Sequence, residues 1–356
     1  MSKKTASIII GLLVIVVAIY FKNKSNHADE ADIINNFDTN QKNDNTMNNP
    51  TSQSKKITIG FYNVENLFDI YDDPQTSDES FTPIGEHQWD KEKYNKKLIH
   101  LSEVISDIDP VVMGLAEVEN FDVVDDLIHT SKLKNTNYGI IHAENNDTRG
   151  IDVAAIYNKD IFNLIDYNYH RVSGHGNNNT RDILEIKGNF FNQAPITIFI
   201  THWPSRRKGE DETEHKRIAV AKSLRQIIDD LLEKNPNQDI IVMGDFNDEP
   251  SNESIHKYLM KDDFYNLHRR YEDRNTGTVN HQGEWMVFDQ IIITKSLLKD
   301  NTYNISKKNG EIYDEDYVTF THRDGNTVPS RTYGGTKYYG GYSDHYAVYA
   351  NIVVKF

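Results

Sequence analysis

Apolar and polar positions alternate along most of the chain with spacings that indicate both helices and strands. Residues 90–107 place five apolar side chains on one helical face, namely Tyr94, Leu98, Leu101, Val104 and Ile105. Residues 211–233 repeat this amphipathic pattern. The nearly continuous apolar run 111–118 is typical of a buried strand. Further strands are predicted at 57–64, 151–157, 182–190, 196–201, 239–243, 288–294 and 346–354.

The order of these elements predicts the fold class. Strands occur in runs and are mixed with helices, which favours a layered α/β (α+β) domain with mixed, largely antiparallel sheets. No second linker interrupts the pattern after Lys56. We therefore expect a single domain of about 300 residues that spans residues 56–356.

The first 55 residues have a different composition. Residues 1–24 contain an apolar run over 8–21, interrupted by Gly11 and flanked by lysines. The run is shorter than the roughly 20 residues of a typical membrane span, but it is long enough for a signal-peptide core. Since no clean cleavage site follows, we predict a signal-anchor, with a cleaved signal peptide as the alternative. The polar residues 25–55 are predicted to be a disordered linker. The domain would then be membrane-anchored or secreted, on the extracytoplasmic face.

Composition narrows the function classes. The 356 residues include 54 acidic and 39 basic side chains, which gives a net charge of −15. An acidic surface argues against holding nucleic acid by bulk charge, although an enzyme with a small basic site stays possible. The absence of cysteine excludes disulfides, thiolate zinc sites and cysteine nucleophiles.

Six predicted strand ends finish in polar clusters. They are residues 63–66, Glu117, 201–203, 244–247, Asp289 and 343–345. Each cluster alone could be a turn, a cap or an ion pair. Together they supply carboxylate, carboxamide and imidazole groups without a thiol, which suits a hard cation with oxygen ligands. Two histidines are left for proton transfer or for contact with an anion.

These motifs resemble the endonuclease/exonuclease/phosphatase superfamily. The resemblance covers about residues 57–353, and its most specific parts are Gly244-Asp245-Phe246-Asn247 and the terminal Ser343-Asp344-His345. It implies a four-layered sandwich of two packed β-sheets flanked by helices. It also implies hydrolysis of a phosphoester with a divalent metal, usually Mg²⁺, with Mn²⁺ or Ca²⁺ as alternatives.

The resemblance also assigns roles to individual residues. It implies metal ligation by Glu117, helped by Glu65 and Asp344, with Asn63 beside the metal or phosphate. It implies that Asp245 and Asn247 orient the attacking water and that His202 contacts phosphate or the leaving group. His345 would be held by Asp289 and face the phosphate. Between Asp245 and His345 as general base, we favour Asp245, with His345 as an electrostatic stabiliser.

The substrate is less well specified. Arg149 and Arg181 are candidates for binding phosphate, or they form ordinary ion pairs. The basic segment 206–208 and the Gly/Tyr loop 333–342 favour a nucleic acid, although a charged surface and simple packing explain them equally well. Our hypothesis is an extracytoplasmic endonuclease acting on DNA, with RNA left open. The alternatives are a phosphatase or phospholipid phosphodiesterase of the same fold, and a catalytically inactive binding module. A serine acyl hydrolase is disfavoured because His345 replaces the second glycine of a nucleophile elbow. Oligomeric state cannot be read from the sequence.

Overall fold

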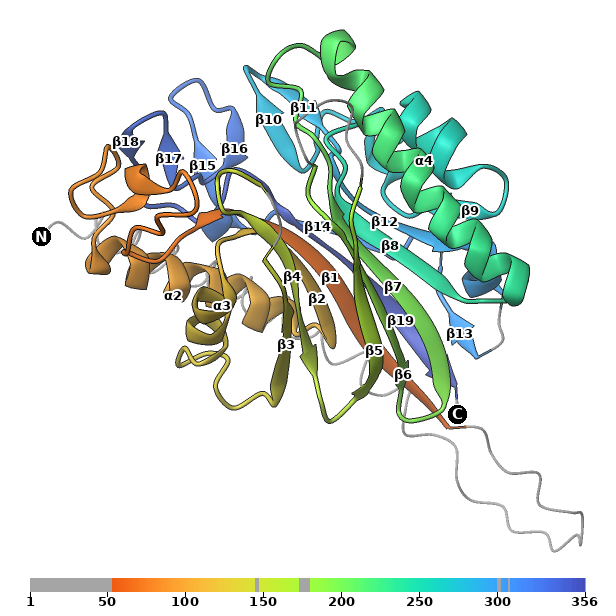
Figure 1. Ribbon diagram of the computed structural model, residues 1–356. Helices are drawn as coiled ribbons and strands as arrows, with labels where there is room; N and C mark the ends of the chain where they lie inside the picture. Colours follow the sequence, from red (N-terminus) through yellow and green to blue (C-terminus); the bar gives the residue numbers. More distant parts are fainter. Residues whose placement is uncertain (1–52, 145–146, 173–179, 300–301, 307, 356) are drawn as a thin grey trace, which may run out of the picture. The chain divides into compact units, whose positions relative to one another are not determined.

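The fold is built on two large sheets, seen in a computed structural model that describes residues 53–144, 147–172, 180–299, 302–306 and 308–355. The seven-stranded sheet A has the order β13-β19-β1-β2-β4-β3, with β14 also paired to β19. The six-stranded sheet B has the order β5-β6-β7-β8-β12-β9. The two sheets pack face to face, with helices on their outer faces (Figure 1). This is the predicted sandwich.

Each sheet is mixed but mostly antiparallel. Sheet A comprises β1 (Ser54–Leu67), β2 (Val112–Val118), β3 (Tyr138–His142), β4 (Asp152–Asn158), β13 (Tyr303–Asn304), β14 (Gly310–Tyr313) and β19 (Ala347–Lys355). Sheet B comprises β5 (Phe162–His170), β6 (Ile183–Phe190), β7 (Ala194–His202), β8 (Ile240–Asp245), β9 (Phe264–Asn266) and β12 (Asp289–Thr294). One pair in each sheet is parallel, β1 with β2 and β7 with β8. A helix lies in each of these two connections, as a parallel crossover requires.

The helices form the outer layers. They are α2 (Lys91–Ile108), α3 (Phe121–Ile128) and α4 (Glu210–Lys234), with a π-helical turn over Ser254–Met260 beside α4. Asp90 caps α2 by accepting a hydrogen bond from the Lys93 amide, and the helix stops at Asp109 in a left-handed conformation. None of the helices in the described part of the chain has the length and apolar character needed to cross a membrane. The predicted signal-anchor 1–24 and most of the linker 25–55 lie outside the described residues.

The core explains why β8 and β12, the inner strands of sheet B, read as continuous apolar runs. Ile241, Met243 and Ile291 face sheet A in one hydrophobic cluster. Their neighbours Val242 and Ile292 face α4 in the other. A strand covered on both faces needs apolar residues at every position, so no alternation is visible in the sequence.

Three two-stranded hairpins lie at the end of the sandwich where the sheet-B strand β8 finishes (Figure 1). They are β10–β11 (Val279–His281 and Glu284–Met286), β15–β16 (Thr319–Thr321 and Thr327–Pro329) and β17–β18 (Tyr333–Gly334 and Lys337–Tyr338). The sequence did not predict them, nor α3, β3, β5, β9, β13 or β14. These segments are too short or too polar to show a clear period.

A buried ion pair ties α4 to the loop that follows β8. The guanidinium of Arg217 is fully buried, and its Nε lies 2.6 Å from Asp248 Oδ1. Replacing Arg217 with Met should lower the free energy of unfolding by about 3 kcal/mol, because a buried carboxylate loses a partner. Urea denaturation of the two proteins measures this change. Lys257→Met, which breaks an exposed pair with Glu253 on the same side of the molecule, should cost less than about 1 kcal/mol. Equal losses of unfolding free energy in the two variants would show that the buried Arg217–Asp248 pair stabilises the protein no more than an exposed pair does.

Candidate active site

Polar side chains from both sheets meet at one edge of the sandwich. His202 ends β7, Asp245 ends β8 and Asp289 begins β12. In the strand register Asp245 lies opposite His202 on one side and opposite Asp289 on the other. Three residues far apart in the sequence are therefore neighbours across three adjacent strands.

Sheet A contributes through irregular backbone. The pairing of β1 with β2 shifts between Asn63 and Leu67, and the pairing of β2 with β4 shifts between Ala116 and Val118. Within these shifts Glu65, Asn66 and Glu117 have positive φ angles of 50°, 55° and 65°. Bulges of this kind redirect side chains and are common beside active sites. They turn Glu117 away from the regular alternation of β2.

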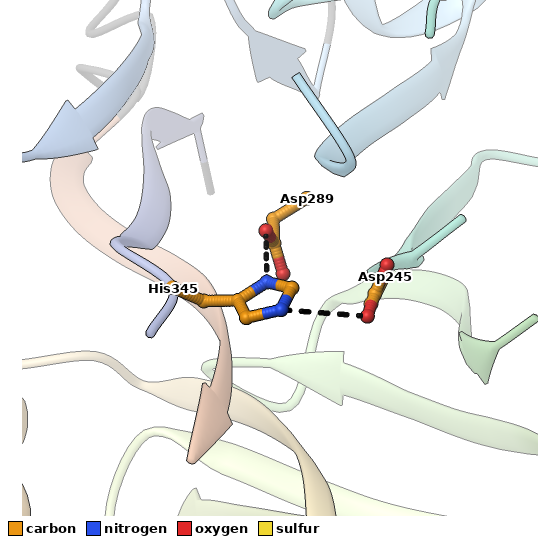
Figure 2. A group of neighbouring side chains, drawn as sticks. All are labelled: Asp245, Asp289 and His345. Carbon is orange, nitrogen blue, oxygen red and sulfur yellow. Dashed lines mark hydrogen bonds and ion pairs between the residues drawn. The ribbon is translucent and has the colours of Figure 1, made fainter. Parts of the chain in front are cut away.

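Asp289, His345 and Asp245 form the centre of the site. The Nδ1 atom of His345 lies 2.8 Å from Asp289 Oδ2, and its Nε2 lies 4.0 Å from Asp245 Oδ2. Figure 2 shows the imidazole between the two carboxylates. Burial alone would lower the pKa of His345, but the charges of Asp289, Asp245 and Asp344 outweigh it and raise the pKa well above its ordinary value. The surrounding carboxylates therefore favour the charged form of the His345 imidazole.

Asp245 is held in place from both sheets. Its Oδ2 accepts a hydrogen bond of 3.1 Å from Asn63 Nδ2 on β1, and its Oδ1 accepts one of 2.9 Å from the Asn247 amide. Burial raises the pKa of Asp245 to about 7, against the lowering effect of His345, with a further rise from Asp289. A carboxylate with a pKa near neutrality is suited to accept a proton from water.

His202 presents a neutral imidazole to the same space. Its Nε2 lies 3.4 Å from Asp245 Oδ2 and 4.0 Å from Glu117 Oε1. Burial, then the charges of Arg181, Arg149 and His345, lower its pKa well below the ordinary value. Their surroundings therefore favour opposite charge states for the two histidines of the site. A neutral His202 can donate one N–H to an anionic oxygen without adding net charge.

The donor set fits a hard divalent cation. Glu117 Oε2 accepts a hydrogen bond from the Asn66 amide, while Oε1 faces His202, and the side chain is 16% exposed. Among the described residues, Asp245, Asp289 and His345 are the one group of three whose ligand atoms lie within 4.8 Å of one another. Oxygen-rich groups that lack thiolates are the ligands that Mg²⁺ prefers. Since His345 Nδ1 and Asp289 already bond each other, Glu117 is the more available ligand.

Glu65 and Asp344 behave differently from Glu117. Both oxygens of Glu65 accept backbone N–H groups, from Thr332 and Tyr333, and the side chain is buried. Burial, followed by the charge of Asp344, raises the pKa of Glu65 to about 7. Asp344 is one-third exposed and faces Arg331 at 3.9 Å. Asp344 is open to a ligand at the mouth of the site, whereas Glu65 is turned into the protein.

The arginines are used unequally. The guanidinium of Arg181 donates to the carbonyl oxygens of His202 and Trp203 and to Asp147, so its nitrogens brace the end of β7. Arg149 also bonds Asp147, but its side chain is 46% exposed. Arg149 is therefore better placed to meet a substrate, and phosphate binding by either residue stays a prediction.

The structure supports in part the less specific interpretation of the basic segment 206–208 and of the Gly/Tyr loop 333–342, namely an ordinary charged surface and simple packing. Arg206 donates to Asn247 O, Asp248 and Asn252, whereas Arg207 and Lys208 are exposed. Most tyrosines of the loop 333–342 pack on the protein, for example Tyr342 on His100. Tyr339 is 55% exposed. The surface available for stacking is smaller than the sequence suggested.

Two supporting residues escaped the sequence analysis. The Thr278 hydroxyl accepts hydrogen bonds of 3.1 Å from the amides of Phe288 and Asp289, and the Thr278 carbonyl accepts one from Tyr346. Nothing in the sequence marks this threonine. Lys97 is buried and faces the loop that carries Tyr342. Its position between Tyr94 and Leu98, close to the apolar face of the predicted helix, was an available signal.

Comparisons with known proteins agree with the geometry. The model of the Endonuclease/Exonuclease/phosphatase family matches residues 58–354. An endonuclease/exonuclease/phosphatase family protein from Bacteroides thetaiotaomicron has a similar structure, with a TM-score of 0.53 and 15% identity over 85% of this chain and 99% of that one. D. rerio TDP2 complexed with single strand DNA product has a TM-score of 0.53 and 14% identity over 83% of this chain and 98% of that one. A mannosyl-6-phosphatase from B. thetaiotaomicron has a TM-score of 0.51 and 14% identity over 84% and 99%. No curated protein matches the chain. At such identities the structures support the fold alone.

Proposed function

Since the chain belongs to the endonuclease/exonuclease/phosphatase family of phosphoric ester hydrolases, we propose that it is a Mg²⁺-dependent phosphodiesterase that cleaves DNA internally, on the extracytoplasmic side of a membrane. The observation that carries the catalytic part is the convergence of Glu117, Asp245 and the Asp289–His345 pair at one edge of the sandwich. The N-terminal composition supports the location.

The residues divide the chemistry among them. A divalent cation held by Glu117, with Asp344 within reach, would neutralise charge that develops on the phosphate oxygens. Asp245 takes the proton of the attacking water, because its raised pKa makes it a base near neutral pH. The amide of Asn247 and the carboxamide of Asn63 keep the Asp245 carboxylate oriented for this step.

The two histidines stabilise the reacting phosphate in different ways. The His345 cation, oriented by Asp289, supplies positive charge that needs no rearrangement during the reaction. Neutral His202 donates a hydrogen bond to a phosphate oxygen or to the leaving oxygen. In-line displacement at phosphorus requires such positioning and charge more than covalent chemistry by the protein.

DNA as the substrate is supported by exposed cations near the centre, and a neighbour of the same fold shows that this fold can hold a DNA product. Arg149 is electrostatically coupled to His202, and Arg331 lies beside Asp344. The structure of D. rerio TDP2 holds a single strand DNA product. The second candidate is a phosphomonoesterase, favoured by the bonded state of Arg206 and by a mannosyl-6-phosphatase of the same fold.

Substrate profiling of the purified full-length chain distinguishes the two. We expect nicking of supercoiled plasmid in Mg²⁺, with no release of inorganic phosphate from sugar phosphates or inositol phosphates and no cleavage of sphingomyelin vesicles. Glu117→Gln protein purified in the same way controls for a contaminating nuclease. Intact plasmid together with phosphate release would replace the nuclease with the phosphatase, and inactivity on every substrate would favour a binding module.

A further inference from the structure

The segment 330–345 carries Asp344 and His345 of the catalytic edge and is held by a buried pair of opposite charges, Glu65 and Lys97. This segment includes the β17–β18 hairpin and continues through Asp344 to His345. The hairpin closes on itself, since the amides of Tyr339 and Gly340 donate to Thr332 O and that of Gly341 donates to Arg331 O. Thr332 is one of the residues through which the rest of the protein holds this hairpin, together with Tyr333 and Tyr342.

Glu65, on β1, holds the backbone at Thr332 by hydrogen bonds. Its carboxylate accepts the amide of Thr332 and, at 3.1 Å, the amide of Tyr333. The positive φ of Glu65 places this side chain at the bulge of β1. A buried carboxylate that accepts two successive backbone N–H groups holds that backbone in one orientation. Each of these two oxygens has one acceptor position taken by a backbone N–H, which makes Glu65 a poorer candidate for the ligand role that the family resemblance implied.

Lys97, on α2, holds the side chain of the same residue by a hydrogen bond. Its ammonium is 1% exposed and donates hydrogen bonds of 2.6 Å to Thr332 Oγ1 and to Tyr342 O. It also interacts electrostatically with Glu65. Burying an ammonium group costs free energy unless hydrogen bonds and an opposite charge compensate for the lost solvation. Both hydrogen-bond partners of Lys97 lie in the segment 330–345.

A short series of hydrogen bonds connects this part of the segment to the catalytic residues. Ser343 Oγ donates to Asn63 O at 2.7 Å, and the same oxygen accepts the His345 amide at 3.1 Å. His100, one turn after Lys97 on α2, contacts Gly341 O and stacks on Tyr342. Thr332 and Ser343 are thus fixed at two points of the β1 bulge, and Arg331, Asp344 and His345 lie beside these points.

We propose that Glu65 and Lys97 are positioning residues that clamp Thr332 and thereby hold Arg331, Asp344 and His345 against the catalytic edge. Glu65 acts through this clamp and not as a ligand of the metal. The inference rests on the proposed phosphodiester hydrolysis at this site and assigns two of its supporting residues. It also separates Glu65 from Glu117, although both are acidic residues at bulges of neighbouring strands.

Thr332 allows a matched test, because Val replaces the hydroxyl that Lys97 needs with a methyl group, whereas Ser keeps the hydroxyl and removes the methyl group. In the full-length protein, Thr332→Val should lower kcat for plasmid nicking about 10-fold with KM nearly unchanged, and Thr332→Ser should restore it to within about 3-fold of the parent. Lys97→Met should lower kcat about 100-fold. Equal activity of Thr332→Val and Thr332→Ser would overturn the clamp.

Metal binding and amide exchange test the clamp without relying on turnover. Glu65→Gln should leave the affinity for Mn²⁺, measured by calorimetry, within about 3-fold, whereas loss of a true ligand weakens it by about 10-fold or more. The amides of Thr332 and Tyr333 should exchange with deuterium at least about 10-fold faster in Lys97→Met. Tenfold weaker Mn²⁺ binding by Glu65→Gln, or unchanged exchange in Lys97→Met, refutes the inference. If the parent cleaves no substrate, the proposed function fails, and these two measurements still decide the clamp.

Discussion

Replacing Glu117 with Gln should lower kcat/KM for DNA cleavage by about 1,000-fold, which corresponds to about 4 kcal/mol of transition-state stabilisation. The amide keeps the shape of the side chain and can still accept the hydrogen bond of the Asn66 amide. It removes the negative charge that faces the centre of the site near His202. The affinity for Mg²⁺ should fall by about 10- to 100-fold in a titration of activity against metal concentration.

Glu119 provides the matched control for this substitution. It lies two residues further along, is buried, and accepts the amide of Asp69. Burial, with added repulsion from Asp69 and Asp78, raises the pKa of Glu119 to about 8, so its carboxyl is mostly protonated at neutral pH. Glu119→Gln then changes little charge and should keep activity within about 3-fold. If Glu117→Gln were as active as this control, the cation would have to bind at Asp245, Asp289 and His345 instead.

Part of the candidate site could be predicted from sequence because Glu117, His202 and Asp245 stand at the ends of apolar runs. Asp245 follows a strand that is buried on both faces, and the parallel partner β7 ends in His202 at the same level. A polar residue after such a run stands out. The ends of neighbouring strands also meet at one edge of a sheet, so the residues that belong together could be named without knowing the strand order.

The ion-pair and hydrogen-bond partners of individual charged side chains could not be predicted in the same way. Arg206 looked like a cation for phosphate, but the buried carboxylate of Asp248, 42 residues away, takes its guanidinium. Glu65 looked like a ligand, but the backbone of a hairpin 267 residues away turns it inward. Long charged side chains choose partners that only the tertiary structure brings near. The three short hairpins β10–β11, β15–β16 and β17–β18 were missed for a related reason, since strand pairing and hydrogen bonding define them more than apolar spacing does.

Replacing His345 with Gln should lower kcat by about 1,000- to 10,000-fold, because the fixed positive charge beside the phosphate is lost. Asp289→Asn should have a smaller effect, about 100-fold, since the imidazole stays in place but loses the carboxylate that orients it and favours its charged form. Single-turnover rates for plasmid nicking at saturating Mg²⁺ measure both changes. Comparable losses in the two variants would mean that orientation of the ring, and not its charge alone, carries the effect.

The pH dependence of kcat separates His345 from Asp245 by the sign of each limb. Asp245 acts as a carboxylate, so activity should rise with pH through a pKa of about 7 or below, because a bound cation favours the charged form. His345 acts as a cation, so activity should fall as pH rises through its raised pKa. In Asp289→Asn the pKa of His345 loses its largest raising cause, so the alkaline limb should move to lower pH. The acid limb should move by a smaller amount in the same direction, because Asp289 also contributes to the raised pKa of Asp245. A shift of the acid limb alone, with the alkaline limb unchanged, would make His345 the base, because a base must lose its proton before it can act.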